Sequence, residues 1–149
     1  MLLDMLYTPW LHWGYDFVPK WLHGLYGLLT GLMLYAYLGR RMNGVYGLLG
    51  GFFFLSTPVI LPLSHWGYID LGIAFYSTAT LLCLLRWREQ RHVLGWLAPA
   101  GLSLGFALTT KPNGMVVALS IGLLFLLVLA KPPRKDLRGV AVETALFGA

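Results

Sequence analysis

Charged residues are scarce in this sequence. Asp, Glu, Lys and Arg together make up 11% of its 149 residues, whereas a soluble domain usually carries about 25%. Apolar residues make up 58% of the chain, and its mean hydropathy is +0.69. A soluble domain of this length leaves about a third of its unfolded surface exposed to water, so it could not hide this much apolar surface. The composition therefore predicts an integral membrane protein and excludes an ordinary soluble domain.

Cysteine is almost absent too, since Cys83 is the only one. A single cysteine cannot form a disulfide within the chain, and its place inside an apolar run is typical of a small core residue. The opening residues, MLLDMLYTPW, contain an acid and no basic stretch, which argues against a signal peptide. The net charge of +5 does not indicate a nucleic-acid partner, because the basic residues lie between apolar runs and not on a polar surface.

Long apolar runs are what the sequence does contain. A helix needs roughly 17 to 25 mostly apolar residues to cross the hydrocarbon layer, and helices satisfy their backbone polar groups in lipid, whereas open strands do not. We therefore predict an all-α fold, a polytopic transmembrane bundle of about five helices with the start of a sixth near Val140. Residues 1–20 are expected to form an extracytoplasmic segment. The expected helices cover residues 21–39, 46–62, 70–86, 95–110 and 113–130.

Basic residues gather in alternate loops between these runs. Nine of the eleven Lys and Arg residues do so, and the positive-inside rule makes that side cytoplasmic. Lys20 and Lys111 fall on the other face, together with Asp4, Asp16 and Asp70. We therefore expect the two ends of the bundle to differ in charge. The nine basic residues are Arg40, Arg41, Arg86, Arg88, Arg91, Lys131, Arg134, Lys135 and Arg138.

Asp70 is the first candidate functional residue, because it opens an apolar run that has no further formal charge until Arg86. An ionisable residue at the edge of a membrane helix is by default a functional hypothesis. A first-turn acid also interacts favourably with the helix dipole and can cap the helix. A functional and a structural role are therefore equally open for Asp70.

Lys111 is the second candidate, because it is one of two cations on the outer face and precedes the turn signal Pro-Asn-Gly. Its side chain either extends to water or holds a phosphate as a compact point charge. A lipid phosphate at the outer interface is the expected anion. Asp16 and Lys20 are four residues apart and are expected to pair on one helix face.

Three histidines, His12, His23 and His65, are expected on the same outer face. Imidazoles bind zinc and other metals, but the spacing of these three matches no tight ligand pattern. We therefore predict no metal ligands. The sequence also lacks a nucleotide-binding loop, a G-x-S-x-G nucleophile motif and a metalloprotease helix.

Glycines recur at a spacing of four residues in three of the apolar runs. Such Gly-x-x-x-Gly pairs let two helix backbones approach closely, so we expect tight helix packing at each of them. The pairs are Gly27 and Gly31, Gly47 and Gly51, and Gly101 and Gly105.

Two consecutive segments resemble a known family. In "GYIDLGIAFYSTATLLCLLRW" an aspartate opens an apolar run after a loop, and "WLAPAGLSLGFALTTKPNGMVVAL" continues with a W-L-x-x-x-G-x-x-x-G pattern that ends at a lysine. Both resemble the membrane glycosyltransferases of the GT-C superfamily, in the branch of protein O-mannosyltransferases and aminoarabinose-transferring lipid A enzymes. Residues 19–41 are similar to the preceding helix of that branch, so the resemblance spans residues 19–130. The matching positions are Tyr68, Ile69, Asp70, Trp96, Leu97, Gly101, Gly105 and Lys111.

The resemblance implies a reaction and a site. Such enzymes transfer a sugar from a polyprenyl-phosphate donor to a glycan, lipid or protein acceptor at the extracytoplasmic face, here expected in a bacterial inner membrane. By the same resemblance Lys111 binds the donor phosphate, Asp70 is a supporting acid, and Tyr68 and His65 bind substrate. A divalent cation is compatible with such a site. The acceptor would lose its proton to a carboxylate held near the anomeric carbon, and an inverting single displacement would need no covalent enzyme intermediate.

The chain also departs from that branch, whose members carry their principal catalytic acid in a first extracytoplasmic loop that has no good match here. Both ends look cut, so we expect a fragment, and because that catalytic acid is missing we expect the fragment to be inactive alone. Two other functions stay open. One is a transporter or channel in which Asp70 is an ion or proton site, although transporters commonly bind substrate near the bilayer midplane. The other is a scaffold whose glycine pairs serve packing alone.

Overall fold

The computed structural model describes residues 2–60, 70–89 and 94–130. All regular structure in these ranges is helical, which confirms the predicted all-α class. None of the helices in these ranges combines the length and the apolar character that crossing a membrane requires, so the predicted transmembrane character is not confirmed. The expected sixth helix near Val140 lies outside the described residues. The helices are α1 (Leu2–His12), α2 (Phe17–Arg41), α3 (Gly44–Leu55), α5 (Asp70–Glu89), the short 3₁₀ helix η1 (Leu94–Trp96), α6 (Leu97–Thr110) and α7 (Gly114–Ala130).

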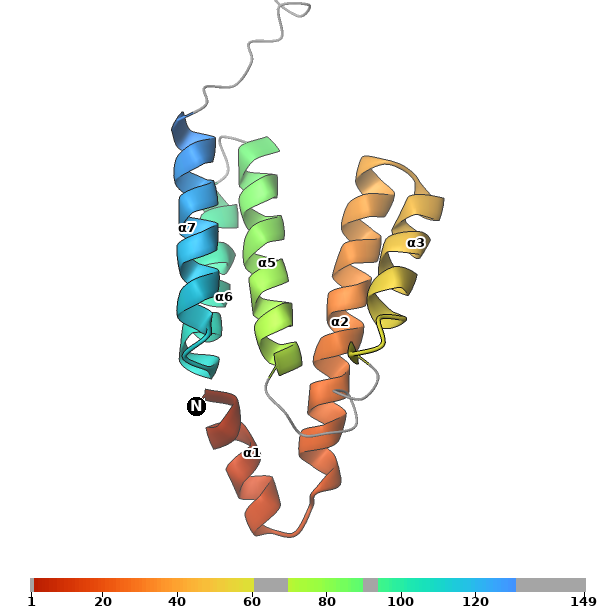
Figure 1. Ribbon diagram of the computed structural model, residues 1–149, viewed down its shortest axis with the longest axis vertical. Helices are drawn as coiled ribbons and strands as arrows, with labels where there is room; N and C mark the ends of the chain where they lie inside the picture. Colours follow the sequence, from red (N-terminus) through yellow and green to blue (C-terminus); the bar gives the residue numbers. More distant parts are fainter. Residues whose placement is uncertain (1, 61–69, 90–93, 131–149) are drawn as a thin grey trace, which may run out of the picture.

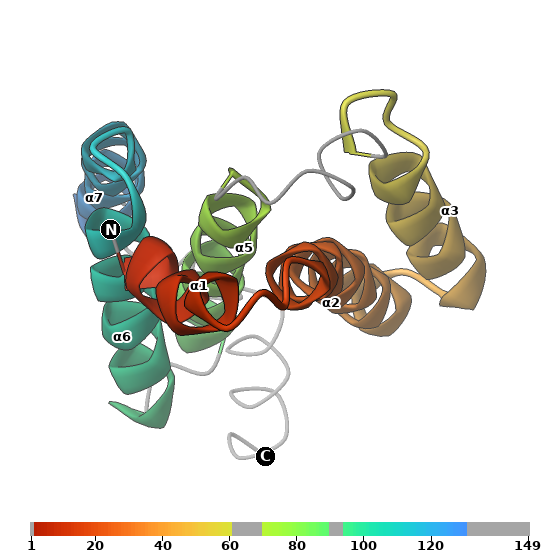
Figure 2. The same cartoon turned by 90° about the horizontal axis from the view of Figure 1, so that it is seen from below.

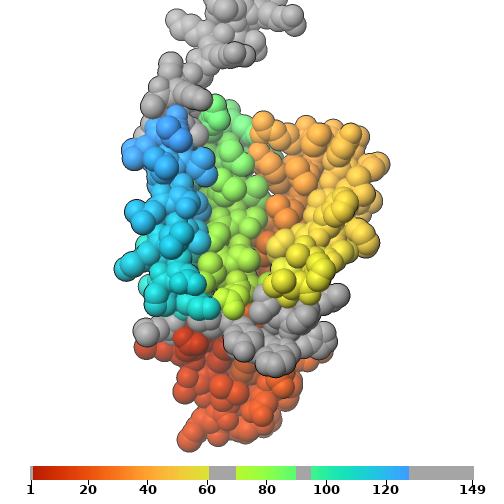
Figure 3. Space-filling view, viewed as in Figure 1, coloured from red at the N-terminus to blue at the C-terminus, as the bar shows by residue number. Residues whose placement is uncertain are grey.

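Helix α5 stands at the centre of the bundle. It contacts α2 on one side and α6 and α7 on the other, while α3 packs against α2 (Figure 1). Helix α1 crosses the end of the bundle at which α5 begins, and it contacts both α2 and α6 (Figure 2). Together with the first turns of α2 it forms one end of the molecule (Figure 3). The start of α5, the end of α6 and the helix α1 therefore lie close together.

Helix α1 lies within residues 1–20, for which the sequence predicts no helix. Its buried residues, Leu3 and Tyr7, are 1% and 3% exposed and lie one turn apart, so a single face of α1 meets the bundle. Leu3 packs closely on Gly72 of α5, and a Cβ added to Gly72 would overlap a methyl group of Leu3. After α1 the chain reverses at Gly14, whose φ of 78° suits glycine and few other residues.

Helix α3 has different ends from the predicted helix 46–62. It starts after Asn43, whose side chain accepts a hydrogen bond from the backbone N–H of Tyr46 at 3.0 Å and so caps the helix. It ends at Leu55. Pro58 follows three residues later, and a proline cannot continue the hydrogen-bond ladder and disfavours helical backbone just before it.

Three glycines of the predicted pairs, Gly31, Gly47 and Gly51, lie where α2 and α3 come into close contact, whereas Gly27 packs against Leu71 of α5. A Cβ on Gly47 would lie 2.7 Å from the carbonyl oxygen of Tyr35, and one on Gly51 would lie 3.1 Å from that of Gly31. The backbones can approach this closely only without side chains, which confirms the predicted packing for these helices. On α6, by contrast, a Cβ at either glycine of the third pair meets no described neighbour within 4 Å, so the prediction is wrong there.

Candidate functional site

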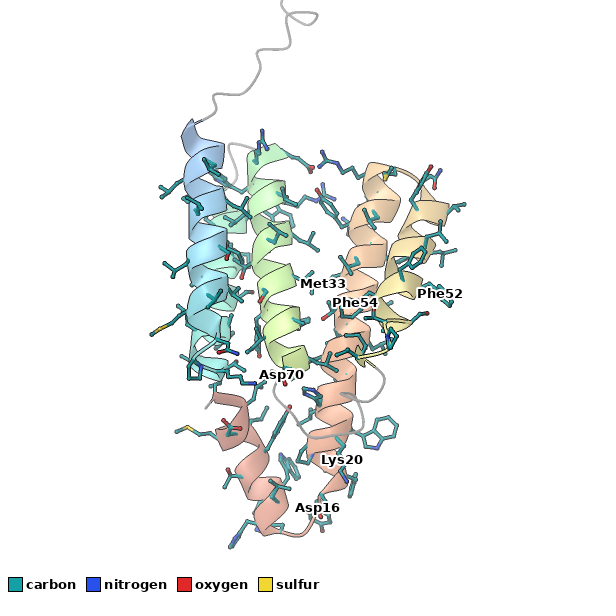
Figure 4. All side chains as sticks on the ribbon, viewed as in Figure 1. Asp16, Lys20, Met33, Phe52, Phe54 and Asp70 are labelled. Atoms are coloured by element: carbon teal, nitrogen blue, oxygen red, sulfur yellow. The ribbon has the colours of Figure 1, made fainter. Side chains whose placement is uncertain are left out.

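The two residues that the sequence singles out, Asp70 and Lys111, form an ion pair. Lys111 Nζ donates to Asp70 Oδ1 over 2.8 Å, although the residues are 41 positions apart in the chain. Asp70 is the first residue of α5, and Lys111 follows the last residue of α6. Their side chains are 38% and 35% exposed. The pair therefore lies at the surface of the bundle, at the end where α1 crosses it (Figure 4).

Local chain geometry brings Lys111 to Asp70. The positive end of the α5 dipole favours a carboxylate in its first turn. Lys111 is extended, with φ −155° and ψ 151°, because a residue before a proline is forced out of the helical region. The backbone N–H of Gly114 donates to the Lys111 carbonyl at 2.8 Å and closes the turn. A Cβ on Gly114 would overlap the carbonyl oxygen of Ala107, so this turn needs glycine.

The ion pair uses only part of the hydrogen-bonding capacity of Lys111. An ammonium group has three N–H donors, and Asp70 is its one hydrogen-bond acceptor among the described residues. A surface ion pair contributes only about 0–1 kcal/mol to stability, so this contact adds little to the free energy of unfolding. A phosphate could accept from the remaining donors while Asp70 holds the ammonium in place.

Next to this pair, α1, α2 and α5 hold a polar cluster, defined here as Tyr7 and His23, which are buried, together with Tyr26 and Tyr76, which are half-buried. His23 is 0% exposed, and neither of its ring nitrogens has a hydrogen-bond partner in the described part of the chain; the Tyr7 hydroxyl also lacks one. The hydroxyls of Tyr26 and Tyr76 lie 3.3 Å apart. Burial raises the pKa of Tyr7 to about 12, so its hydroxyl stays neutral.

The sequence predicts neither this cluster nor the burial of His23. A signal was present, because His23, Tyr26 and Thr30 recur at intervals of three and four residues and so share one face of a helix. Thr30 is also 0% exposed, and its hydroxyl donates to the Tyr26 carbonyl at 2.7 Å. The contribution of Tyr7 depends on α1, which the sequence does not predict.

Other predicted residues do not join the ion pair. Tyr68 and His65 lie outside the described residues. Asp16 and Lys20 form no ion pair, and the expected pairing is wrong because Asp16 precedes the first helical residue of α2 and its side chain makes no capping bond (Figure 4). No three His, Cys, Asp or Glu side chains within the described segments are grouped so as to hold a metal ion.

The opposite end of the bundle is basic. The last turn of α2 carries Arg40 and Arg41, and the last turn of α5 carries Arg86 and Arg88. Arg41 pairs with Glu89 at 2.5 Å, and Arg86 approaches the same carboxylate at 3.5 Å. The ion pair between Arg41 and Glu89 thus links α2 and α5 at this end, and Asp70 stands at the other end of α5.

A family model matches most of the chain. The model of the family described as dolichyl-phosphate-mannose-protein mannosyltransferase matches residues 13–145. No curated protein and no solved structure matches the chain. The matched range includes both Asp70 and Lys111, and it covers most of the sequence. The chain therefore belongs to the dolichyl-phosphate-mannose-protein mannosyltransferase family, and with it to the GT-C glycosyltransferases.

Proposed function

We propose that this chain acts in the transfer of a sugar from a polyprenyl-phosphate donor to an acceptor at the extracytoplasmic face of a membrane, and that Lys111 holds the donor phosphate. The observation that carries this proposal is the 2.8 Å contact between Lys111 and Asp70, in a chain whose family is one of mannosyltransferases. The family description makes mannose the expected sugar and a protein the expected acceptor.

In this proposal Lys111 acts on the leaving group. Negative charge grows on the donor phosphate as the bond to the sugar breaks, and a preorganised cation stabilises that charge in the transition state. Asp70 is a supporting acid that fixes the position of the ammonium group through their hydrogen bond. Tyr68 and His65 remain predicted contacts to the substrate, and a divalent cation at this site also remains a prediction.

We further propose that the helices form a bundle within a membrane. Large apolar side chains on α2, α3 and α7 are exposed, and Phe52 points away from the bundle (Figure 4). Extended apolar surface of this kind marks contact with lipid or with another protein. The basic end would face the cytoplasm by the positive-inside rule, and the Asp70–Lys111 end would face outward. Exposed apolar residues include Leu25, Leu28, Leu32, Phe52, Phe53, Leu119, Leu123 and Leu126.

Binding of a polyprenyl monophosphate to the full chain in detergent tests the role of Lys111 without requiring turnover. Lys111→Ala removes a charge-assisted hydrogen bond, a type of contact that contributes roughly 1.5–3 kcal/mol. The dissociation constant should therefore rise about tenfold or more. Lys20→Ala is the matched control, because it removes the other cation expected on this face and should leave binding unchanged. Equal binding by the wild type and Lys111→Ala, or an equal loss in Lys20→Ala, would overturn the proposal.

A further inference from the structure

A cavity of about 200 Å³ lies between α2 and α5 at the basic end of the bundle. Its walls are mainly apolar and include Met33, Ala79 and Cys83, and Figure 4 shows Met33 between the two helices. Arg40 and Arg86 also line it. The cavity therefore has an apolar interior and cationic side chains, on the side of the molecule that the Asp70–Lys111 site does not use.

At this end of the bundle, arginines outnumber acids among the described residues, and two of the arginines, Arg40 and Arg86, line the cavity. The final turns of α2 and α5 hold four arginines, and Glu89 is the acid that pairs with two of them, Arg41 and Arg86. Arg40 donates from Nε to the carbonyl of Ala36 at 3.2 Å and forms no ion pair with any acid in the described ranges. Positive charge is thus left over beside an apolar cavity, and a matching ligand needs an anionic group joined to an apolar group.

We propose that this cavity binds an acidic phospholipid, with the phosphate at Arg40 and Arg86 and the start of an acyl chain against the wall formed by Met33, Ala79 and Cys83. Basic pockets between membrane helices on the cytoplasmic side are known to suit anionic headgroups. This inference rests on the membrane placement in the proposed function, because only there does the basic end meet a leaflet rich in such lipids.

The size of the cavity favours a lipid over a free small molecule. Pockets that enclose a drug-sized ligand usually measure about 300–1,000 Å³, so a cavity of about 200 Å³ encloses only part of an occupant. A phospholipid satisfies this condition, because the rest of its chains stay in the bilayer. Trp96 and Tyr37 also line the cavity, and Trp and Tyr are the residues that prefer the depth of the headgroups.

Native mass spectrometry of the full chain in detergent measures lipid retention directly. The wild type should retain phosphatidylglycerol in preference to phosphatidylcholine. Arg40→Gln should weaken retention of phosphatidylglycerol about fivefold, the effect of one arginine near an anionic lipid. Arg88→Gln is the matched control, since it removes the same charge from the same end but does not line the cavity. Equal retention of the two lipids, or an equal loss in both variants, would overturn the proposal.

Cys83 provides a second, site-specific readout because it is the chain's only cysteine and lines the cavity. Phosphatidylglycerol should slow its alkylation by a small maleimide several-fold, whereas phosphatidylcholine and inorganic phosphate should not. Ala79→Leu fills the apolar wall and should abolish this protection, while Ala98→Leu, at an exposed position on α6, should keep it. Equal protection by inorganic phosphate would show an ion site without a lipid and would contradict the proposal.

The lipid test can fail independently of the proposed function. If Lys111→Ala leaves polyprenyl-phosphate binding intact while the lipid preference holds, the proposed function is wrong and the lipid cavity stands. If the lipid preference is absent while donor binding depends on Lys111, only the lipid cavity is wrong.

Discussion

His23 is a polar side chain that the fold buries completely without giving it a hydrogen-bond partner among the described residues. A buried polar group without a partner costs about 1–3 kcal/mol, and an apolar replacement of similar shape is often neutral or stabilising. We therefore expect His23→Leu to keep the free energy of unfolding the same or to raise it by about 1 kcal/mol. Thermal unfolding in detergent, followed by circular dichroism, measures the change.

His12→Leu is the matched control for this substitution, because His12 is exposed at the end of α1. It should change the unfolding temperature little. A clear drop in stability for His23→Leu would mean that the imidazole has a partner in the folded chain and that the polar cluster is a structural network. If His23→Leu is stable but binds polyprenyl phosphate less well, the histidine contributes to donor binding and not to stability.

Individual residues show where sequence reasoning works and where it stops. Asp70 and Lys111 could be chosen from the sequence, because charges are rare in this chain and each stands at the edge of an apolar run. Their 2.8 Å contact could not be derived that way, since it depends on how α5 and α6 pack. The burial of His23 could not be derived either, because it requires α1 to cover that end of the bundle.

At the scale of helices, the close contact between α2 and α3 depends on glycines, which have no side chain. A Cβ on Gly47 would lie 2.7 Å from a backbone oxygen of α2, and backbone cannot move aside as a flexible side chain can. Gly47→Ala should therefore lower the free energy of unfolding by about 1–3 kcal/mol, as overpacking does. Chemical denaturation in detergent measures this loss.

Gly101→Ala is the internal contrast on α6, where an added Cβ meets no described atom within 4 Å. Alanine is favoured over glycine in a helix interior by about 0.8–1.0 kcal/mol, so this change should stabilise the protein. The same substitution is thus expected to have opposite signs at the two positions. If Gly101→Ala were as destabilising as Gly47→Ala, α6 would have a close neighbour at that glycine.

Among the helices, long apolar ones can be predicted from the sequence, whereas short helices and exact helix ends are harder to predict. The predicted helix 70–86 and the observed helix α5 both begin at Asp70. The start could be predicted because this acid follows a loop and precedes an uninterrupted apolar run. Helix α1 gives no such signal. It is 11 residues long and contains Pro9, and its burial depends on two residues, Leu3 and Tyr7. A pattern that short does not stand out from its surroundings, so its position could only come from the fold.

At the scale of the whole molecule, charge separates the two ends of the bundle. The arginines of α2 and α5 lie at one end, and the Asp70–Lys111 pair lies at the other. This separation could be predicted from the sequence, because loops at alternate ends of antiparallel helices share a side whatever the details of packing. The cavity near Arg40 could not be predicted from the sequence, since it depends on how α2 and α5 pack against each other.

The separation of charge leads to a test of membrane orientation by single cysteines in a Cys83→Ser background. Met42 follows α2 at the basic end and is 59% exposed, and Asn113 is exposed in the turn after Lys111. The positive-inside rule places the basic end in the cytoplasm. A membrane-impermeant maleimide should therefore label Asn113→Cys in intact cells but label Met42→Cys only after the membrane is permeabilised. Labelling of both without permeabilisation would place the two ends on one side, and a carboxylate and ammonium pair facing an extracytoplasmic lipid phosphate would then lose its basis.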